Sequence, residues 1–372
     1  MKISWKNWDE IPKGKLKYFA ELFAKNESSQ LIKNVTTELR ILQISPDIYF
    51  PVTINDTEWE SSFVCSPYNA YALYSKDELL MEVKNKFIQY PLLFIIHLLS
   101  KWLKFGQINK NVHINNFLLS TNPYPEWSGL EIKEITKFIQ LQYPDHSIIF
   151  RSLNNNQHQH LLKIFEAEDY KLIGSRQVYM FDLSYEKWLK KRNNRLDNKL
   201  IARKNLIFVD HAAMGEFIEQ ALNLYQKLYL KKYSKYNPQF TLAYFKTVYQ
   251  QNIMLFQGYK DHNNVLKCFS GLFIIGDTIT SPLVGYDTDM PQSEGLYIHA
   301  AQLAVIHKFK TGLRLNLSSG APKFKRMRGG EPSIEYSAIY LNHLKWKRRI
   351  VWKSLQYVSN KIGVPLIEKY KL

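Results

Sequence analysis

Two kinds of hydrophobic pattern alternate along most of the chain from about residue 40. In one kind every second residue is apolar, which is typical of strands, and in the other apolar residues recur every three or four positions, which is typical of helices. In the first half this pattern predicts strands at 48–54, 112–119, 146–150, 170–174 and 177–183, and helices at 79–104, 130–141 and 158–167. Such alternation favours an α/β protein over an all-α or all-β one.

Local signals add boundaries to these elements. Ser75 is followed three residues later by Glu78, a capping-box pattern that predicts the start of a helix at Ser75. Pro91 is expected to break that helix, because proline lacks an amide proton and clashes with the preceding turn. In the second half, Gly276 and Asp277 form a two-residue hairpin signal between two predicted strands.

The second half is expected to begin with a long basic helix capped by Ser184. The elements predicted there are helices at 185–204, 214–231, 242–250, 295–310 and 344–362, and strands at 206–209, 253–259, 265–275, 278–286, 313–317 and 334–341. A loop or a single helical turn is expected around 324–327. Two helices, three antiparallel strands, a helix and a strand therefore follow one another.

Composition fits a folded protein with an unusual charge. Of the 372 residues 45% are hydrophobic, enough to bury a core, and the formal net charge is +17. This excess implies attraction to an anionic partner or reflects a lysine-rich host proteome. The two cysteines, Cys65 and Cys268, have no metal-site spacing and fit a reducing, cytoplasmic compartment. The start of the chain has no apolar signal peptide, and the apolar run 91–103 is short for a membrane span and predicts a buried helix instead.

Three segments carry a resemblance to a known family. They are YEKWLKKRNNRLDNKLIARK at 185–204, GLYIHAAQLAVIHKFKTGLRLNLSSG at 295–320 and FKRMRGGEP at 324–332. In this order they resemble the FemAB-like branch of the GNAT (Gcn5-related N-acetyltransferase) superfamily, whose members carry two GNAT-like domains. The resemblance implies a mixed-sheet α/β fold with a degenerate GNAT-like domain at 1–175 and an acyltransferase domain at 176–372. The first half resembles the family only in its order of elements.

Known relatives transfer an acyl or aminoacyl group onto an amine. The resemblance therefore implies an N-acyltransferase whose acceptor is a small molecule or a cell-envelope precursor, and whose donor is an acyl-CoA, an acyl-carrier protein or an aminoacyl-tRNA. Relatives that use acyl-CoA have a loop rich in glycine before a helix, whereas residues 289–296 contain only Gly295, preceded by Glu294. A carboxylate at a helix start repels pyrophosphate, which disfavours conventional CoA binding.

The same resemblance places Lys325 at the acceptor site, where its charge could polarise a carbonyl group or hold a phosphate. A solvated basic loop is the alternative. The residues expected to bind substrate beside it are Lys323, Arg326, Arg328, Gly329 and Glu335, of which Glu335 is either a buried partner of Lys325 or a surface carboxylate. The catalytic candidates after the third strand are Asp287 and Glu294, with Asp289 beside them, as general base or as helix caps, and Tyr286 as a hydroxyl acid or a strand-end aromatic.

Basic residues also predict an anion-binding surface. Arg192, Arg195 and Arg203 are compatible with one face of the basic helix, and a second cluster around Trp346 and Trp352 suits stacking, interfacial insertion or simple packing. Transfer RNA and an acidic membrane surface are the partners considered. Polar residues at strand ends, such as 151–154, could line a ligand cleft or only form loop hydrogen bonds. His158 and His160 lack nearby acids, so no metal is expected.

Three functions therefore remain open: an N-acyltransferase, an aminoacyl-tRNA-dependent transferase of the FemAB type, and a non-catalytic binding module built on a GNAT fold.

Overall fold

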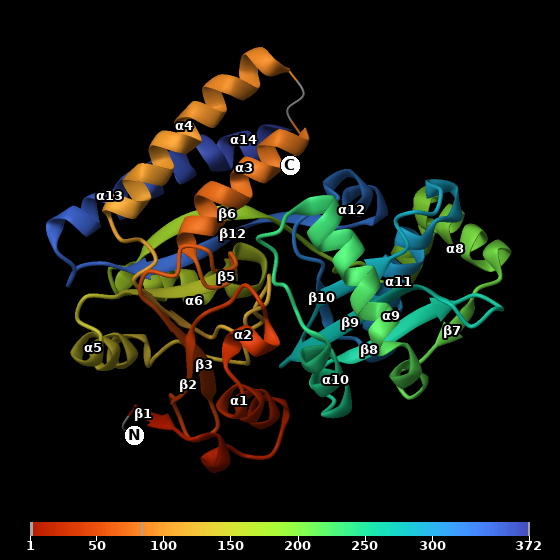
Figure 1. The fold of residues 1–372 in the computed structure, drawn as a ribbon, viewed down its shortest axis with the longest axis horizontal. Coiled ribbons are helices and arrows are strands. Elements are labelled where there is room, and N and C mark those ends of the chain that lie inside the picture. Colours follow the sequence, from red (N-terminus) through yellow and green to blue (C-terminus); the bar gives the residue numbers. More distant parts are fainter. Residues whose placement is uncertain (1–2, 83–84, 371–372) are drawn as a thin grey trace.

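The strands of the protein form one mixed sheet, in the computed structural model that describes residues 3–82 and 85–370. The sheet has 12 strands in the order β1-β2-β3-β4-β5-β12-β6-β11-β10-β9-β8-β7, with helices on both faces (Figure 1). The mixed-sheet α/β prediction is confirmed. The strands are β1 Ser4–Lys6, β2 Glu38–Gln43, β3 Tyr49–Asn55, β4 Asn111–Ile114, β5 Ser147–Asn154, β6 Lys171–Met180, β7 Ile207–Val209, β8 Leu255–Lys260, β9 Leu266–Ile275, β10 Thr278–Tyr286, β11 Arg314–Asn316 and β12 Glu331–Tyr340.

Helices connect and cover these strands. They are α1 Lys15–Lys25, α2 Ser28–Leu31, α3 Tyr74–Glu82, α4 Lys86–Phe105, α5 Ile132–Gln142, α6 Asn155–Ala167, α7 Tyr185–Lys190, α8 Arg192–Lys204, α9 Ile218–Tyr225, α10 Leu242–Gln250, α11 Leu296–Thr311, α12 Pro322–Arg328, α13 Trp346–Val358 and α14 Val364–Tyr370. Within the described residues, no helix combines the length and the apolar character needed to cross a lipid bilayer.

The same sequence of pairings occurs twice in the sheet. In the first half β2, β3 and β4 are antiparallel neighbours, and β4 then lies parallel to β5, which α5 connects to it. In the second half β8, β9 and β10 are antiparallel neighbours, and β10 lies parallel to β11 across α11. The repeat explains why the first half resembles the second in its order of elements.

Strands β6 and β12 join the two halves. β12 lies between β5 and β6 and is antiparallel to both, while β6 also contacts β11. The predicted domain boundary between residues 175 and 176 falls inside β6, and the segment from β12 onward lies against the first half. The division into two domains stays a prediction.

Alternate residues of the central strands feed two separate cores, because successive side chains on a strand point to opposite faces. Ile148 and Phe150 pack with α5 and α6, whereas Ile149 packs with Leu103 of α4 and Val351 of α13. The first half is therefore covered by α5 and α6 on one face and by α3, α4 and α13 on the other (Figure 1).

Several predicted boundaries are wrong. Ser75 does not begin a helix, since a π-helical turn at 69–73 already leads into α3 and the Ser75 hydroxyl bonds back to the Ala70 carbonyl. Pro91 is the sixth residue of α4 and lies inside the helix instead of ending it, so the helix continues although the amide hydrogen bond of this position is lost. The two strands expected at 170–183 are the single strand β6.

Two further elements differ from their predictions. The basic helix is split into α7 and α8 at Lys191, whose backbone is extended. The segment around 324–327 is a full seven-residue helix, α12, not a loop or a single turn. Ser184 does cap α7 as predicted, accepting a hydrogen bond from the Lys187 amide.

A buried arginine of α13 binds the two turns that precede β4 and β5. Arg348 donates to the carbonyl oxygens of Gly106 at 3.1 Å, Gln107 at 3.0 Å and Lys110 at 2.7 Å, and also to that of Asp145. Burial lowers the pKa of this guanidinium to about 10, although Asp145 and Asp56 favour its charge. These carbonyls belong to the turn after α4 and the turn before β5.

Replacing Arg348 by Met should lower the free energy of unfolding by about 3–5 kcal/mol, because several carbonyl groups lose a charged side-chain donor. Urea denaturation measures this change. Lys347→Met is the matched control, since Lys347 is exposed on the same helix and its loss should cost less than about 0.5 kcal/mol. Equal losses for the two variants would contradict the role given to Arg348.

Candidate functional site

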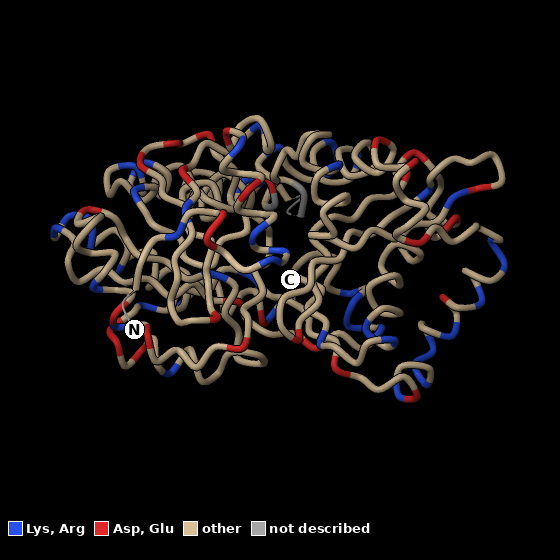
Figure 2. Tube along the Cα trace, turned by 90° about the horizontal axis from the view of Figure 1, so that it is seen from below, with Lys and Arg blue, Asp and Glu red and all other residues tan. Residues whose placement is uncertain are grey.

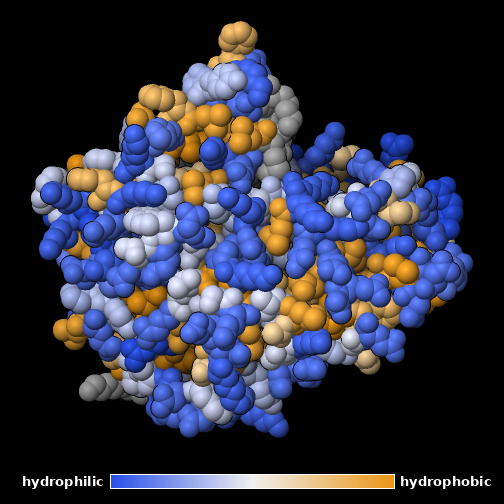
Figure 3. All heavy atoms as spheres, viewed as in Figure 1, coloured by the Kyte–Doolittle hydropathy of each residue, from blue (hydrophilic) through white to orange (hydrophobic). Residues whose placement is uncertain are grey.

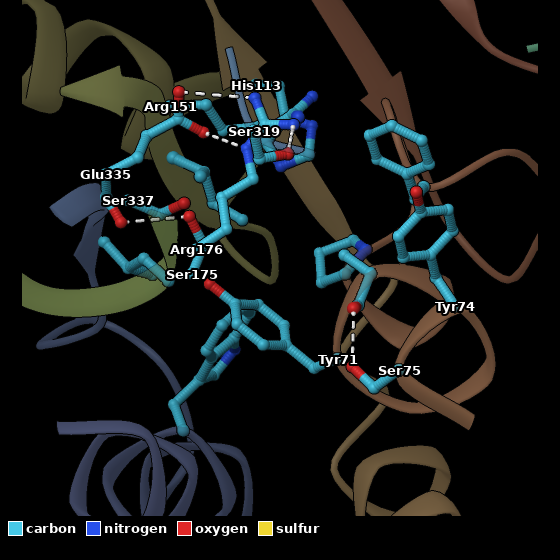
Figure 4. A pocket seen from close by; sticks show the side chains of 16 residues that line it. Tyr71, Tyr74, Ser75, His113, Arg151, Ser175, Arg176, Ser319, Glu335 and Ser337 are labelled. Atoms are coloured by element: carbon cyan, nitrogen blue, oxygen red, sulfur yellow. Dashed lines mark hydrogen bonds and ion pairs between the residues drawn. The ribbon is translucent and has the colours of Figure 1, made fainter. Parts of the chain in front are cut away.

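A cleft opens on the face of the sheet that α3 and α13 cover. It encloses about 740 Å³ of empty space, part of it open to solvent. Strands β4, β5, β12 and β6 line one side, and the turn at 69–73, α3 and Trp352 of α13 line the other (Figure 4). The cleft therefore lies where the two shared strands meet the first half of the chain.

Two arginines and one carboxylate set the charge of the cleft. Arg176 on β6 donates from Nε to Glu335 Oε1 at 2.8 Å and from Nη2 to Oε2 at 3.3 Å. Glu335 is only 3% exposed, so it is neither a surface group nor the partner of Lys325. Arg151 donates to the Val64 carbonyl oxygen at 2.5 Å, and burial lowers the pKa of its guanidinium. Because arginine stays charged, two cations face one anion.

Three other side chains of the cleft carry buried polar atoms that lack a hydrogen-bond partner among the described residues. These atoms are the Tyr71 hydroxyl, His113 Nδ1 and Trp352 Nε1. Burial raises the pKa of Tyr71 to about 12, and burial with the nearby Arg151 holds the pKa of His113 well below 6.5. Both groups are thus neutral near pH 7. Unpaired buried groups are rare in folded proteins and are frequent where a ligand or bound water supplies the partner.

Lys325 lies behind this cleft, on α12. Its ammonium donates to the carbonyl oxygens of Leu317 at 2.7 Å, Ser318 at 3.2 Å and Ser319 at 2.7 Å. The Ser319 hydroxyl in turn accepts a hydrogen bond from Arg176 at 3.3 Å. Lys325 is therefore a buried side chain that fixes the 317–319 turn, and not a solvated loop residue.

Opposing effects act on the charge of Lys325. Three carbonyl acceptors match the three N–H donors of an ammonium group, whereas burial and the neighbouring Arg176 disfavour the charge. The pKa of Lys325 is lowered to about 7. A fraction of Lys325 is therefore neutral at physiological pH.

The other basic candidates on α12 have different surroundings. Arg328 forms a two-point ion pair with the buried Asp197 of α8, at 2.5 and 2.8 Å, and Arg326 donates to the Tyr179 hydroxyl at 2.8 Å. Lys323 is exposed. Gly329 ends α12 at a φ of 105°, where a side chain would clash with Leu183. Arg328 and Gly329 thus fit and shape the helix, and their predicted contact with substrate stays a prediction.

The carboxylates after β10 are held by lysines. Lys227 donates to Asp287 at 2.8 Å and to Asp289 at 2.6 Å, and Lys204 donates to Glu294 at 2.8 Å. Burial is the largest single effect and would raise the pKa of Asp287, but the hydrogen bonds from Lys227 and the Asp289 amide, with the charges of Lys227 and Lys267, together lower it. A general-base role for Asp287 or Glu294 stays a prediction that requires these ion pairs to open.

Tyr286 lies near these groups and accepts a hydrogen bond from Lys232 at 2.9 Å. Its ring lies 5.7 Å from that of Tyr297, which packs at 4.7 Å against Phe324 of α12. Tyr286 and α12 thus border one aromatic cluster. The role of Tyr286 as an acid stays a prediction.

Arg192, Arg195 and Arg203 are exposed on α8, far along the sheet from the cleft (Figure 1). Figure 2 shows the blue segments that follow one another at this end of the molecule. Since Asp197 is buried against Arg328, the exposed side of α8 is strongly cationic. No group of three or more His, Cys, Asp or Glu side chains in residues 3–82 and 85–370 is arranged to hold a metal ion, and the absence of a metal stays a prediction.

The sequence did not indicate four residues of the cleft. They are Tyr71, His113, Arg176 and Trp352, of which Trp352 was expected only as part of a basic cluster. Arg151 had a weak signal, since polar residues near a strand end were considered as a possible cleft wall. The others belong to elements up to about 280 residues apart, and only the pairing of β12 with β5 and β6 brings them together.

Comparison with known proteins gives matches in structure only. Neither protein-family models nor curated proteins match the chain. Among solved structures, FemX aligns over 96% of this chain and 100% of its own, at 8% identity and a TM-score of 0.55. The chain has a FemX-like fold.

Two other structures align with part of the chain. L-PGS from Bacillus licheniformis covers 61% of this chain and 78% of its own, at 12% identity and a TM-score of 0.43. A GCN5-related N-acetyltransferase from Kribbella flavida covers 62% and 80%, at 11% identity and a TM-score of 0.33. The likeness to FemX, by contrast, extends over both halves of this chain.

The lowered pKa of Lys325 can be measured. Titration of labelled lysine side chains by NMR should show one amine with a midpoint near 7, lost in Lys325→Met. Arg176→Met should raise that midpoint, because it removes a nearby positive charge, whereas Arg326→Met should leave it in place. A midpoint for Lys325 near 10 would contradict the assignment.

The lowered pKa of Lys325 also predicts that the stability of the protein depends on pH. Its folded pKa lies below the unfolded value of 10.5, so the unfolded chain binds more protons between about pH 7 and 10.5. Relative to Lys325→Met, the free energy of unfolding of the unaltered protein should therefore rise with pH across this window. Urea denaturation at several pH values measures the difference.

Proposed function

We propose that this protein is an N-acyltransferase, which moves an acyl or aminoacyl group from an activated thioester or ester onto an amine acceptor. The proposal combines the FemX-like fold with the chemistry of the cleft. A likeness in fold alone does not give an activity, so the cleft residues carry the argument.

The single observation that supports it best is the uneven charge of the cleft. Arg151 and Arg176 face only one carboxylate, Glu335, and Arg151 uses a backbone carbonyl as its partner. A guanidinium binds carboxylate or phosphate through paired hydrogen bonds. We propose that Arg151 binds an anionic group of the acceptor or the donor. The negative charge of that group would balance the second guanidinium of the cleft.

Acyl transfer requires that the amine lose a proton, that the oxyanion be stabilised and that both substrates be held together. No nucleophile with a neighbouring base is seen in the cleft wall among the described residues, so direct attack by the amine on the carbonyl carbon is the simpler route. Lys325 serves as a positioning residue, because it fixes the 317–319 turn against Arg176. With a pKa of about 7 it can also exchange a proton near neutrality.

For the donor, an aminoacyl-tRNA is favoured over acyl-CoA by two observations. Glu294, with its partner Lys204, occupies the start of α11, where a CoA pyrophosphate would be bound in a conventional site. The exposed arginines of α8 offer a surface for phosphates instead. A donor on an acyl-carrier protein stays an alternative, as does a non-catalytic binding module.

The activity is tested by offering the purified protein labelled acetyl-CoA, acyl-carrier protein or aminoacyl-tRNA with a set of amine acceptors. Mass spectrometry of ligands released from the protein guides the choice of acceptor. Label should move to an amine. Binding without any turnover for every donor would favour the non-catalytic module and contradict the proposal.

Arg151→Met should lower kcat/KM by about 10- to 100-fold, because it removes a charged hydrogen bond to the substrate. Lys325→Met should also lower it, with Lys133→Met, which replaces an exposed lysine of α5 outside the candidate site, as the control. Thermal unfolding checks that each variant is folded. Full activity of Arg151→Met would exclude the cleft as the substrate site.

The tRNA alternative makes a separate prediction. Replacing Arg192, Arg195 and Arg203 together by Ser should weaken a gel shift with aminoacyl-tRNA by at least about tenfold, and high salt should abolish the shift of the unaltered protein. Lys133→Ser with Lys137→Ser on α5 is the control. A shift that survives the triple replacement would exclude α8 as the RNA surface.

A further inference from the structure

Helix α4 exposes an unusual amount of apolar surface. Phe87 is 92% exposed, Phe94 is 61% exposed and Leu98 is 50% exposed. With Tyr90, Trp102 and Phe105 they recur every three or four residues, so they form one stripe along the helix. Figure 3 shows hydrophobic side chains, in orange, gathered over the region of α4 at the top of the molecule.

The stripe continues onto α13. Trp102 Nε1 of α4 donates to Ser354 Oγ of α13 at 2.7 Å, so the two helices lie side by side. On α13, Trp346 is 63% exposed and Tyr357 is 65% exposed, and Ile350 lies between them on the same side. We call these two stripes together the α4–α13 face.

Neighbouring helices hold the other side of α4. Gln89 and Leu103 are buried, and Leu103 belongs to the core shared with Val351 of α13. The exposed residues are therefore not the unpacked core of a loose helix. Burying them needs a partner from outside the described chain, since apolar patches of this extent mark interaction surfaces.

The charge of this face identifies the partner. Neither α4 nor α13 contains an Asp or Glu, and their exposed or partly exposed cations are Lys86, Lys101, Lys104, Lys347, Arg349 and Lys353. A second copy of the chain placed on this face by two-fold symmetry would bring these cations against one another. A surface with apolar and anionic layers complements both the stripe and its cationic border.

We propose that the α4–α13 face docks on the surface of an anionic lipid membrane, with the apolar stripe buried among the acyl chains and the lysines at the headgroups. Tryptophan and tyrosine, here Trp102, Trp346 and Tyr357, are suited to the boundary between the two layers. A helix of 20 residues, about 30 Å long, lies flat in this arrangement.

Docking would also place the cleft at the lipid surface. Tyr71 of the turn at 69–73 and Tyr74 of α3 line the cleft, and so does Trp352 of α13. The same helix α13 therefore presents Trp352 to the cleft and Trp346 to the membrane. The proposal does not depend on the chemistry inside the cleft and stands or fails separately from the transferase assignment.

The test is co-sedimentation of the full chain with vesicles of phosphatidylcholine alone or mixed with phosphatidylglycerol. Binding should be much tighter to vesicles that contain phosphatidylglycerol, because each cation near an anionic surface adds about fivefold in affinity. Phe94→Glu combined with Leu98→Glu should weaken binding by at least about tenfold. The matched control is Leu141→Glu, which replaces an 84% exposed leucine of α5 on the opposite face of the sheet.

Insertion has its own signature. Trp102 and Trp346 fluorescence should shift to shorter wavelength on binding, and the shift should be lost in Trp102→Phe with Trp346→Phe. Binding should persist in part at about 1 M salt, where charges are screened beyond roughly 3 Å but apolar burial is not.

Three outcomes would overturn the proposal. The first is no binding to phosphatidylglycerol vesicles at low salt. The second is binding that Lys101→Glu with Lys353→Glu abolishes but Phe94→Glu with Leu98→Glu does not, which indicates adsorption of charge alone. The third is a dimer, detected by light scattering, that becomes a monomer in the Phe94→Glu, Leu98→Glu variant, because the face would then be an interface between two copies.

Discussion

The pairing of β12 with β6 is the constraint on which the rest of the molecule depends. In this register Glu335 lies directly opposite Arg176, and the ladder is irregular at the next residue. A shift of one position would turn Glu335 to the other face of the sheet and leave the half-buried Arg176 guanidinium without its carboxylate. The backbone ladder and the ion pair therefore specify the same register, and together they place the charged floor of the cleft.

The cations behind the net charge of +17 have two different structural roles. Arg348, Arg328 and Lys325 are buried or partly buried and bind carbonyl or carboxylate oxygens of the protein itself, so they join helices to neighbouring turns or, for Arg328, to another helix. The arginines of α8 and the lysines beside α4 face solvent. A count of charges in the sequence cannot separate these groups, because each kind of residue occurs in both.

Local patterns predicted most elements well, and the resemblance of the C-terminal half correctly indicated a FemX-like fold. Errors arose where local rules competed with packing: Ser75 lies inside a helix that a π-helical turn began earlier, and Pro91 is accommodated in α4. Lys325 was identified by resemblance, yet its partners are backbone carbonyls, which no sequence pattern reveals. Arg176 and Glu335 are 159 residues apart, and only the long-range strand pairing makes them neighbours.

The position of β12 in the sheet affects how the protein folds during its synthesis on the ribosome. Its edge partner β5 is made long before β12, so during synthesis β5 must wait with an open edge while the whole second half emerges. The apolar residues that α13 later covers stay uncovered for the same time. An unpaired edge and exposed core residues favour aggregation, so the tendency of the nascent chain to aggregate should fall once β12 has been made.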